Sequence, residues 1–252
     1  MDKIALITGA TAGIGEETAM QLAGEGYHVI ITGRRKERLK KLAEQIKSSC
    51  NVEVLTLTFD IRSRAEVDEA IDNLPEEWQN IELLINNAGL AAGLKHLQEG
   101  DINDWEQMID TNVKGLLYIS RKIMPGMVAR ESGHIINVSS IAGKEVYEKG
   151  NVYCATKHAV EAITKGMRLD MLKHGIRVSS VSPGLVETEF SMVRFKGDEE
   201  RAASVYDGLE ALRAEDIAET IVWIASRPPH VNINDVLITP KTQENSTKSV
   251  RK

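Results

Sequence analysis

The sequence has little cysteine, and its cysteines form no pattern. Cys50 and Cys154 are the two cysteines in 252 residues, so they give neither a disulfide framework nor the spacing of metal ligands. The six histidines are scattered and do not repeat at a ligand spacing, which argues against a zinc site. We therefore expect no bound metal, and we expect a reducing, cytoplasmic location.

Long apolar runs and an excess of positive charge are also absent. No stretch approaches the ~18 consecutive apolar residues of a membrane-spanning helix, and the first apolar run is too short for a secretory signal. The net charge is −6, from 31 basic and 37 acidic residues. Proteins that bind nucleic acids or anionic membranes depend on many Lys and Arg contacts to phosphates. The sequence therefore predicts neither partner.

Short apolar runs alternate with longer periodic segments along the chain. We expect strands near 4–7, 28–32, 53–58, 82–86, 133–138, 176–181 and 235–239, and helices near 14–25, 36–48, 63–73, 103–127, 151–173 and 214–226. This alternation is typical of an α/β fold, a single-domain doubly wound parallel sheet (Rossmann fold) of about seven strands. With 42% hydrophobic residues the chain can bury one core. We expect this domain over residues 1–240 and a polar, flexible tail over 241–252.

A glycine-rich turn follows the first expected strand. The run Ile4-Ala-Leu-Ile7 precedes Thr8-Gly-Ala-Thr-Ala-Gly-Ile-Gly15, and a helical pattern comes next. This order places backbone N–H groups and the positive end of a helix where a pyrophosphate can sit. Gly9 permits the tight turn, while Gly13 and Gly15 let the helix start approach a ligand and the sheet. The alternative is a tight turn that binds nothing.

Tyr153 and Lys157 lie four residues apart in a helical pattern, so they project from the same face. A free phenol titrates near ~10, and an adjacent ammonium favours its phenolate form. The pair can therefore act as an acid–base catalyst, and Ser140 supplies a hydroxyl thirteen residues before Tyr153. Taken alone, such a pair is more often an ordinary surface feature.

These motifs occur together with Asn86-Asn-Ala-Gly89, Asn112 and Pro183-Gly184. In this order, over roughly residues 4–190, the sequence resembles the short-chain dehydrogenase/reductase family. The resemblance implies hydride transfer between a nicotinamide cofactor and a substrate carbonyl or carbinol carbon. The resemblance therefore implies a Rossmann fold and the activity of an oxidoreductase.

The resemblance also implies a role for each catalytic residue. Tyr153 would exchange the proton with the substrate oxygen, and Lys157 would favour phenolate and hold the nicotinamide ribose. Ser140 would bind the substrate oxygen where negative charge develops, and Asn112 would relay the proton. Ser139 could compete with Ser140, but the spacing to Tyr153 favours Ser140.

The residues after the second expected strand indicate which dinucleotide binds. The run Thr32-Gly33-Arg34-Arg35 lacks the acidic residue that accepts a hydrogen bond from the ribose 2′-hydroxyl of NAD. Guanidinium groups instead favour a 2′-phosphate. We therefore expect NADP(H) as the cofactor, with Gly33, Arg34 and Arg35 at the phosphate. The basic residues from Lys36 onward are interpreted as the solvated face of a helix.

The resemblance extends the cofactor site beyond the phosphates. Asp60 and Ile61 would contact the adenine, and Thr188 would hold the nicotinamide carboxamide. The complete set of expected cofactor residues is Gly9, Thr11, Gly13, Ile14, Gly15, Gly33, Arg34, Arg35, Asp60, Ile61, Asn87, Ala88, Gly89, Tyr153, Lys157, Pro183, Gly184, Val186 and Thr188.

The segment Phe190 to Gly208, within a region of about 189–212, is expected to form a mobile substrate lid. This segment and residues 228–243 resemble the family branch that acts on 3-hydroxy acids such as serine, allo-threonine and 3-hydroxypropionate. The expected substrate contacts are Ser140, Tyr153, Arg194 and Lys196. Arg194 or Lys196 would pair a substrate carboxylate, and the alternative is that both are exposed lid charges.

Two other functions stay open. One is an NADPH-dependent carbonyl reductase of another substrate class, such as 3-oxoacyl thioesters, steroids or xenobiotic ketones. The other is a non-catalytic dinucleotide-sensing protein, which the intact catalytic residues disfavour. The resemblance also implies a homo-oligomer, a tetramer or dimer built from long helices such as 103–127 and 151–173. Both apolar faces of such a helix could equally be buried within one chain.

Overall fold

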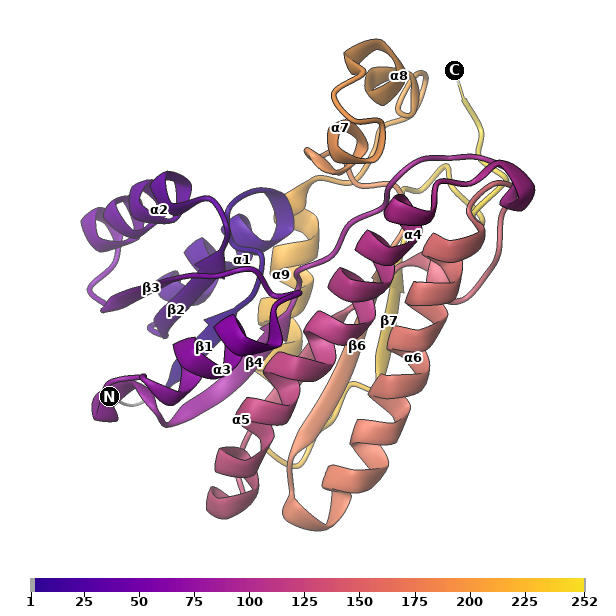
Figure 1. Cartoon of the computed structure of the whole chain (residues 1–252). Coiled ribbons are helices and arrows are strands. Elements are labelled where there is room, and N and C mark those ends of the chain that lie inside the picture. The colour runs from indigo at the N-terminus through magenta and orange to yellow at the C-terminus, as the bar shows by residue number, and fades with distance from the viewer. Residues whose placement is uncertain (1–2, 252) are drawn as a thin grey trace.

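The computed structural model describes residues 3–251 and has one seven-stranded parallel sheet between two layers of helices (Figure 1). The strand order is β3-β2-β1-β4-β5-β6-β7. The strands are β1 (Ile4–Ile7), β2 (His28–Gly33), β3 (Val54–Thr58), β4 (Ile81–Asn86), β5 (His134–Val138), β6 (Arg177–Pro183) and β7 (Asp235–Ile238). All the pairings between neighbouring strands are parallel. The predicted doubly wound α/β fold is confirmed.

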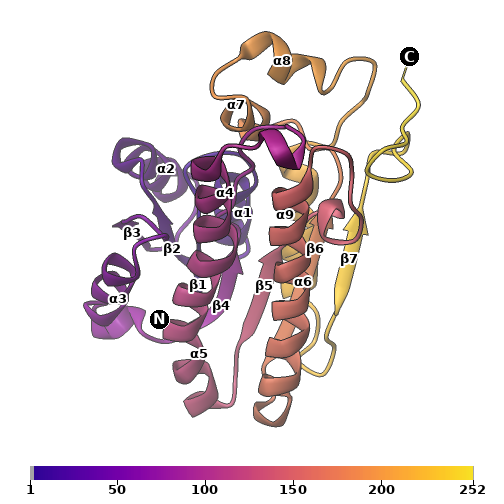
Figure 2. The ribbon, with the colours of Figure 1, turned by 45° about the vertical axis from the view of Figure 1, so that its right-hand side comes forward.

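The helices cover both faces of the sheet (Figure 2). One face packs against α1 (Gly13–Gly24), α2 (Lys36–Ser49) and α9 (Ala214–Ala225). The other packs against α3 (Arg64–Asp72), α5 (Leu116–Arg130) and α6 (Asn151–Met171). Within residues 3–251, every helix is too short or too polar to span a lipid bilayer.

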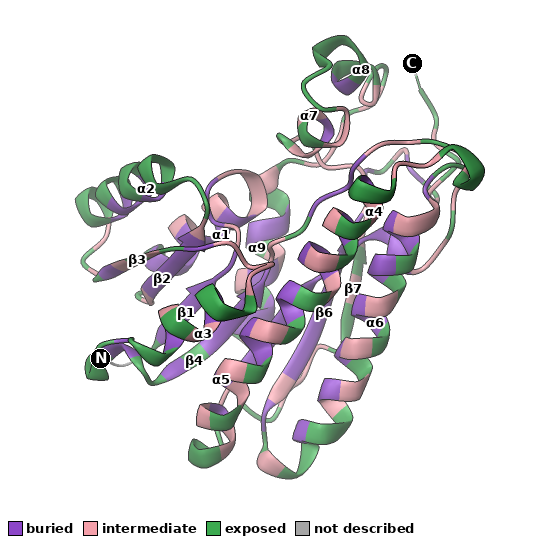
Figure 3. Ribbon diagram, in the orientation of Figure 1, coloured by how far each residue is buried: buried purple, intermediate pink, exposed green. Residues whose placement is uncertain are grey.

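Alternation along the strands divides the core into two halves. In β1, Ala5 and Ile7 belong to the cluster beneath α1, α2 and α9, while Ile4 and Leu6 belong to the cluster beneath α3, α5 and α6. All four side chains are fully buried (Figure 3). A parallel strand that is covered on both faces needs apolar residues at every position, which is why this strand reads as a continuous apolar run.

The helix predicted over 103–127 contains an interruption. Helix α4 (Ile102–Ile109) passes into a π turn at Asp110–Gly115 and then into α5. Such turns occur mostly as single insertions inside α-helices, often at functional sites. Asn112 lies in this turn.

The region 189–212, called the lid segment below, contains two short helices that periodicity does not predict. They are α7 (Phe190–Arg194) and α8 (Glu199–Ser204), and both lie beyond the carboxyl ends of the strands (Figure 1). The backbone N–H of Gly93 donates to the carbonyl of Arg194 at 2.9 Å. This bond joins α7 to the loop that follows β4.

Candidate functional site

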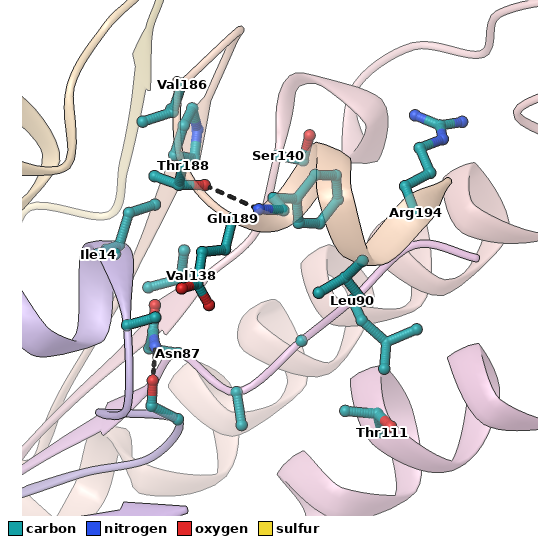
Figure 4. Close-up of a pocket in the computed structure, with 18 of the residues that line it drawn as sticks. Ile14, Asn87, Leu90, Thr111, Val138, Ser140, Val186, Thr188, Glu189 and Arg194 are labelled. Atoms are coloured by element: carbon teal, nitrogen blue, oxygen red, sulfur yellow. Dashed lines mark hydrogen bonds between the residues drawn. The ribbon is translucent and has the colours of Figure 1, made fainter. Parts of the chain in front are cut away.

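A pocket of about 490 Å³ opens at the carboxyl edge of the sheet (Figure 4). Its walls come from the turns after β1 to β6 and from α7. Ligands of doubly wound folds bind at this edge, near the point where the strand order reverses between β1 and β4. Every residue expected to contact cofactor or substrate lines this pocket except Gly15, Asn112 and Lys196.

Each of these three residues has a different position. Gly15 packs beneath the glycine turn, where an added Cβ would lie 2.5 Å from the Gly9 carbonyl oxygen. Asn112 is buried and lies behind the pocket wall. Lys196 is 60% exposed and pairs with Asp104 at 2.8 Å, so it is occupied outside the pocket.

The glycine turn leaves backbone N–H groups available to an anion. Gly9 and Gly13 have φ of +69° and +55°, the left-handed region that glycine adopts without strain. Ala12, the N-cap residue of α1, has no side chain that can bond the first N–H groups of the helix. The positive end of α1 therefore faces the pocket without a side-chain cap from Ala12.

A threonine joins the turns after β1 and β4. The Thr8 hydroxyl oxygen accepts hydrogen bonds from the backbone N–H groups of Asn87 and Ala88, both at 3.0 Å. In return, the Asn87 side-chain amide donates to the Thr8 carbonyl at 2.9 Å. These bonds fix two walls of the pocket relative to each other.

Two arginines stand at the end of β2 beside the pocket. The Arg35 guanidinium donates to the Thr11 hydroxyl at 2.7 and 3.0 Å and pairs with Glu189 at 2.8 Å. Arg34 lies 3.9 Å from the Asp60 carboxylate and keeps 56% of its side chain exposed. Arg34 and Arg35 both line the pocket, and their contact with a 2′-phosphate stays a prediction.

Arg38 lies on the exposed face of α2, as interpreted from the sequence, but it also has an ion-pair partner. Its guanidinium pairs with Glu189 at 2.6 Å, so one carboxylate bridges Arg35 and Arg38. Sequence spacing does not indicate this pair, because Arg35 is the N-cap residue of α2 and lies outside its helical residues. The partner Glu189 could not be found in this way, because it lies in the distant lid segment.

The candidate catalytic side chains come together at the end of β5 and the start of α6. Tyr153 and Lys157 are 8% and 6% exposed, and the Lys157 ammonium donates to the Val138 carbonyl at 3.0 Å. The Ser140 hydroxyl accepts a hydrogen bond from the N–H of Ala142 at 3.1 Å. All three line the pocket, so residues expected to act together do lie together.

Burial dominates the titration of this group. It raises the pKa of Tyr153, and the nearby Tyr147 adds to this, while a hydrogen bond with Ser140 and the charge of Arg194 act in the opposite direction. Burial also lowers the pKa of Lys157 to about 8. Burial therefore favours the protonated phenol at Tyr153, because the charged form is poorly solvated, and the expected effect of Lys157 in favour of phenolate stays a prediction.

Asn112 uses its side chain to hold the walls of the pocket. Its amide oxygen accepts from the N–H of Leu90, and its amide nitrogen donates to the Leu90 carbonyl, both at 2.8 Å. The same nitrogen donates to the Thr156 hydroxyl at 3.0 Å. The π turn thus ties the loop after β4 to helix α6, one residue before Lys157.

The other end of the pocket carries a cation beside aromatic rings. The Arg194 guanidinium lies 5.5 Å from the ring of Tyr147 and 5.7 Å from that of Tyr153. Its Nε donates to the Gly93 carbonyl at 3.2 Å. Among residues 3–251, no carboxylate pairs with Arg194. Tyr147 comes from an irregular loop, and sequence reasoning missed it.

Sequence reasoning also missed the contribution of the residues after 240. Gln243 is 6% exposed, and its side-chain oxygen accepts from the N–H of Leu185 at 2.9 Å. The backbone N–H and hydroxyl of Ser246 both donate to Glu145 at 2.9 Å. Gln243 and Ser246 line the pocket. The flexibility of this tail stays a prediction, but in the structure it forms part of the wall.

The described residues include no metal centre. Over residues 3–251, no three His, Cys, Asp or Glu side chains are grouped so that they could hold a metal ion. The polar groups that line the pocket include the Tyr153 phenol, the Lys157 ammonium and the Ser140 hydroxyl.

Comparison with known proteins identifies the family. A family model described as short chain dehydrogenase matches residues 3–199. The NADP-dependent 3-hydroxy acid dehydrogenase YdfG of Salmonella typhi is 48% identical over 250 residues, 99% of each chain. Sulfoacetaldehyde reductase 2 of Chromohalobacter salexigens is 41% identical, over 96% of each chain. The closed form of a serine dehydrogenase complexed with NADP⁺ matches with a TM-score of 0.92 and 45% identity, over 99% of each chain. This chain belongs to the short-chain dehydrogenase family.

Proposed function

We propose that this protein is an oxidoreductase that transfers a hydride between NADP(H) and a small 3-hydroxy acid or 3-oxo acid. The observation that carries this proposal is the position of Arg194, a guanidinium without a carboxylate partner in the described chain, 5.7 Å from the ring of Tyr153. A substrate whose oxygen reaches Tyr153 can place an anionic group a few bonds away at Arg194. The relatives named above act on serine, 3-hydroxy acids or sulfoacetaldehyde, which all carry an acidic group near the reacting carbon.

The other end of the pocket fits NADP(H). The uncapped start of α1 and the left-handed Gly9 and Gly13 suit a pyrophosphate, while Arg34 and Arg35 suit a 2′-phosphate. Asp60 and Ile61 would contact the adenine, and Thr188 would hold the nicotinamide carboxamide. When bound, the nicotinamide supplies or accepts the hydride.

The residues of the chain would handle the proton. In reduction, the protonated phenol of Tyr153 donates its proton to the substrate oxygen, and in oxidation the phenolate removes it. The Ser140 hydroxyl donates a hydrogen bond to the same oxygen, where negative charge develops. Lys157, whose pKa is lowered to about 8, stays mainly charged at neutral pH and would hold the nicotinamide ribose. Asn112 would relay the proton, and its amide donates a hydrogen bond to Thr156, the residue before Lys157.

One panel of rates tests the proposal. Purified protein is assayed for NADP⁺ and NAD⁺ reduction with serine, allo-threonine and 3-hydroxypropionate, and Tyr153→Phe serves as the blank. We expect turnover with at least one acid, a preference for NADP⁺ and no turnover in the blank. Turnover of steroids, thioesters or neutral ketones but not of any acid would refute the proposed substrate class. NADPH-dependent reduction of sulfoacetaldehyde alone would show that the substrates are sulfonates rather than carboxylic acids.

We also propose a homo-oligomer and a cytoplasmic location. Leu169 and Leu172, at the end of α6, are 75% and 72% exposed, and Leu117 of α5 is 41% exposed. Apolar residues on neighbouring helices suit an interface between subunits. Both cysteines are free, which suits a reducing compartment. A monomer mass from light scattering at micromolar concentration would refute the oligomer.

A further inference from the structure

The carboxylate of Glu189 pairs with Arg35, one of the two arginines expected to bind the cofactor 2′-phosphate. Glu189 lines the pocket and is the N-cap residue of α7, so it belongs to the lid segment (Figure 4). It accepts from Arg35 at 2.8 Å and from Arg38 at 2.6 Å. The hydrogen bond from Arg35 lowers the pKa of Glu189, so the carboxylate is charged at neutral pH. An anion of this chain therefore already pairs with Arg35, one of the two arginines expected at a 2′-phosphate, and with the neighbouring Arg38.

The contact is weak enough to be exchanged. The side chains of Arg35, Arg38 and Glu189 keep 44%, 48% and 46% of their surface exposed. Ion pairs at that exposure contribute little to stability because water screens them. A 2′-phosphate carries more charge than a carboxylate and offers more acceptor oxygens. It would compete successfully for Arg35, which Thr11 holds in place independently of Glu189.

We propose that Glu189 is an internal competitor of the NADP 2′-phosphate. The ion pairs of Glu189 with Arg35 and Arg38 tether the lid segment, and binding of the phosphate weakens this tether. The inference rests on the proposed function, because it takes NADP(H) as the ligand. When the phosphate binds Arg35, Glu189 loses one of its two partners and α7 loses part of its anchor. Conversely, the tethered lid segment weakens binding of the phosphate, since linkage between two sites is reciprocal.

Glu189→Gln tests the competition without a substrate. Dissociation constants for NADP⁺ and NAD⁺ are measured by titration calorimetry on wild type and variant. Because the two ligands differ only in the phosphate, the ratio of their constants isolates that group. Removing one negative charge within a few ångströms of a phosphate should shift this ratio about 3- to 10-fold toward NADP⁺. Thermal unfolding of each variant confirms that it is folded.

Glu187→Gln is the matched control. Glu187 is exposed, precedes Glu189 by two residues and does not line the pocket, so its removal should leave the ratio unchanged. An unchanged ratio in Glu189→Gln, or a shift toward NAD⁺, would overturn the competition. Equal affinity of the wild type for the two cofactors would instead refute the proposed cofactor. The two failures are distinguishable, because the change caused by the variant is read separately from the wild-type value.

Trypsin tests the link to the lid segment, which carries Arg194, Lys196 and Arg201. Cleavage there should be faster in saturating NADP⁺ than in saturating NAD⁺, because the phosphate releases the tether of α7. In Glu189→Gln the two cofactors should give the same rate. Equal rates with both cofactors in the wild type would overturn the link between phosphate and lid.

Discussion

Replacing Arg194 by alanine is expected to weaken the binding of acidic substrates in particular. The guanidinium lines the pocket beside the rings of Tyr147 and Tyr153. Hydrogen bonds to a charged group are worth about 1.5–3 kcal/mol, so losing this anchor should raise KM for a 3-hydroxy acid about 10- to 150-fold. The turnover number should change much less, because the carboxylate is bound alike before and during hydride transfer.

The assay compares each acid with its methyl ester. Arg194 also contacts Gly93 and three aromatic rings, so its truncation disturbs the lid segment, and KM for the uncharged ester reports that disturbance. Lys196→Ala is the control, because Lys196 lies two residues further on but pairs with Asp104 outside the pocket. Its effect on KM should stay within about twofold. Equal rises in KM for acid and ester in Arg194→Ala would refute the carboxylate anchor.

Three further predictions concern the proton, the pH and the stability. Tyr153→Phe should lower kcat about 10²- to 10⁴-fold and leave the Kd for NADP⁺ within about twofold, since the ring remains; near-normal kcat would contradict the proposed acid. Because burial lowers the pKa of Lys157 to about 8, its ammonium is present below that pH and lost above it. The kcat/KM for reduction of a 3-oxo acid should therefore fall as the pH rises through about 8, and a profile that stays flat to pH ~9 would exclude this role. Lys144 pairs with the buried Glu161 at 2.6 Å and with Asp235 at 2.8 Å, so Lys144→Met should lower the free energy of unfolding by about 3 kcal/mol. Urea denaturation should show that adding Glu161→Leu recovers most of the lost stability. No recovery would argue against an energetic coupling between Lys144 and Glu161.

Local signals made the fold predictable. Apolar runs such as Ile4–Ile7 are buried on both faces, and the glycine turn must adopt positive φ at Gly9 and Gly13, so each feature is written in adjacent residues. The Tyr153 and Lys157 pair is equally local, because one helix turn sets its geometry. Residues that directly follow a strand, such as Arg34 and Asn87, could also be placed, because the carboxyl ends of parallel strands lie at one edge of the sheet.

Features that depend on distant contacts were not predictable. Glu189 and Arg38 are 151 residues apart, and Gln243 and Leu185 are 58 apart, so no periodicity reports either contact. Helices α7 and α8 have five and six residues, which is too short for a helical period to show. The position of Lys196 also depends on a distant contact. Its sequence neighbours suggested a substrate contact, but Asp104, which pairs with it, comes from α4.

Helix α7 joins the two ends of the pocket, and this arrangement makes a last prediction. Glu189 precedes its first residue and Arg194 is its last, and five helical residues span only about 7 Å. So short a helix moves as one body, and a phosphate that releases Glu189 should let Arg194 close onto the substrate. KM for a 3-hydroxy acid should therefore be lower with saturating NADP⁺ than with saturating NAD⁺, and Glu189→Gln should abolish the difference. A difference that persists in Glu189→Gln would mean that the cofactor phosphate reaches the substrate site by a route other than α7.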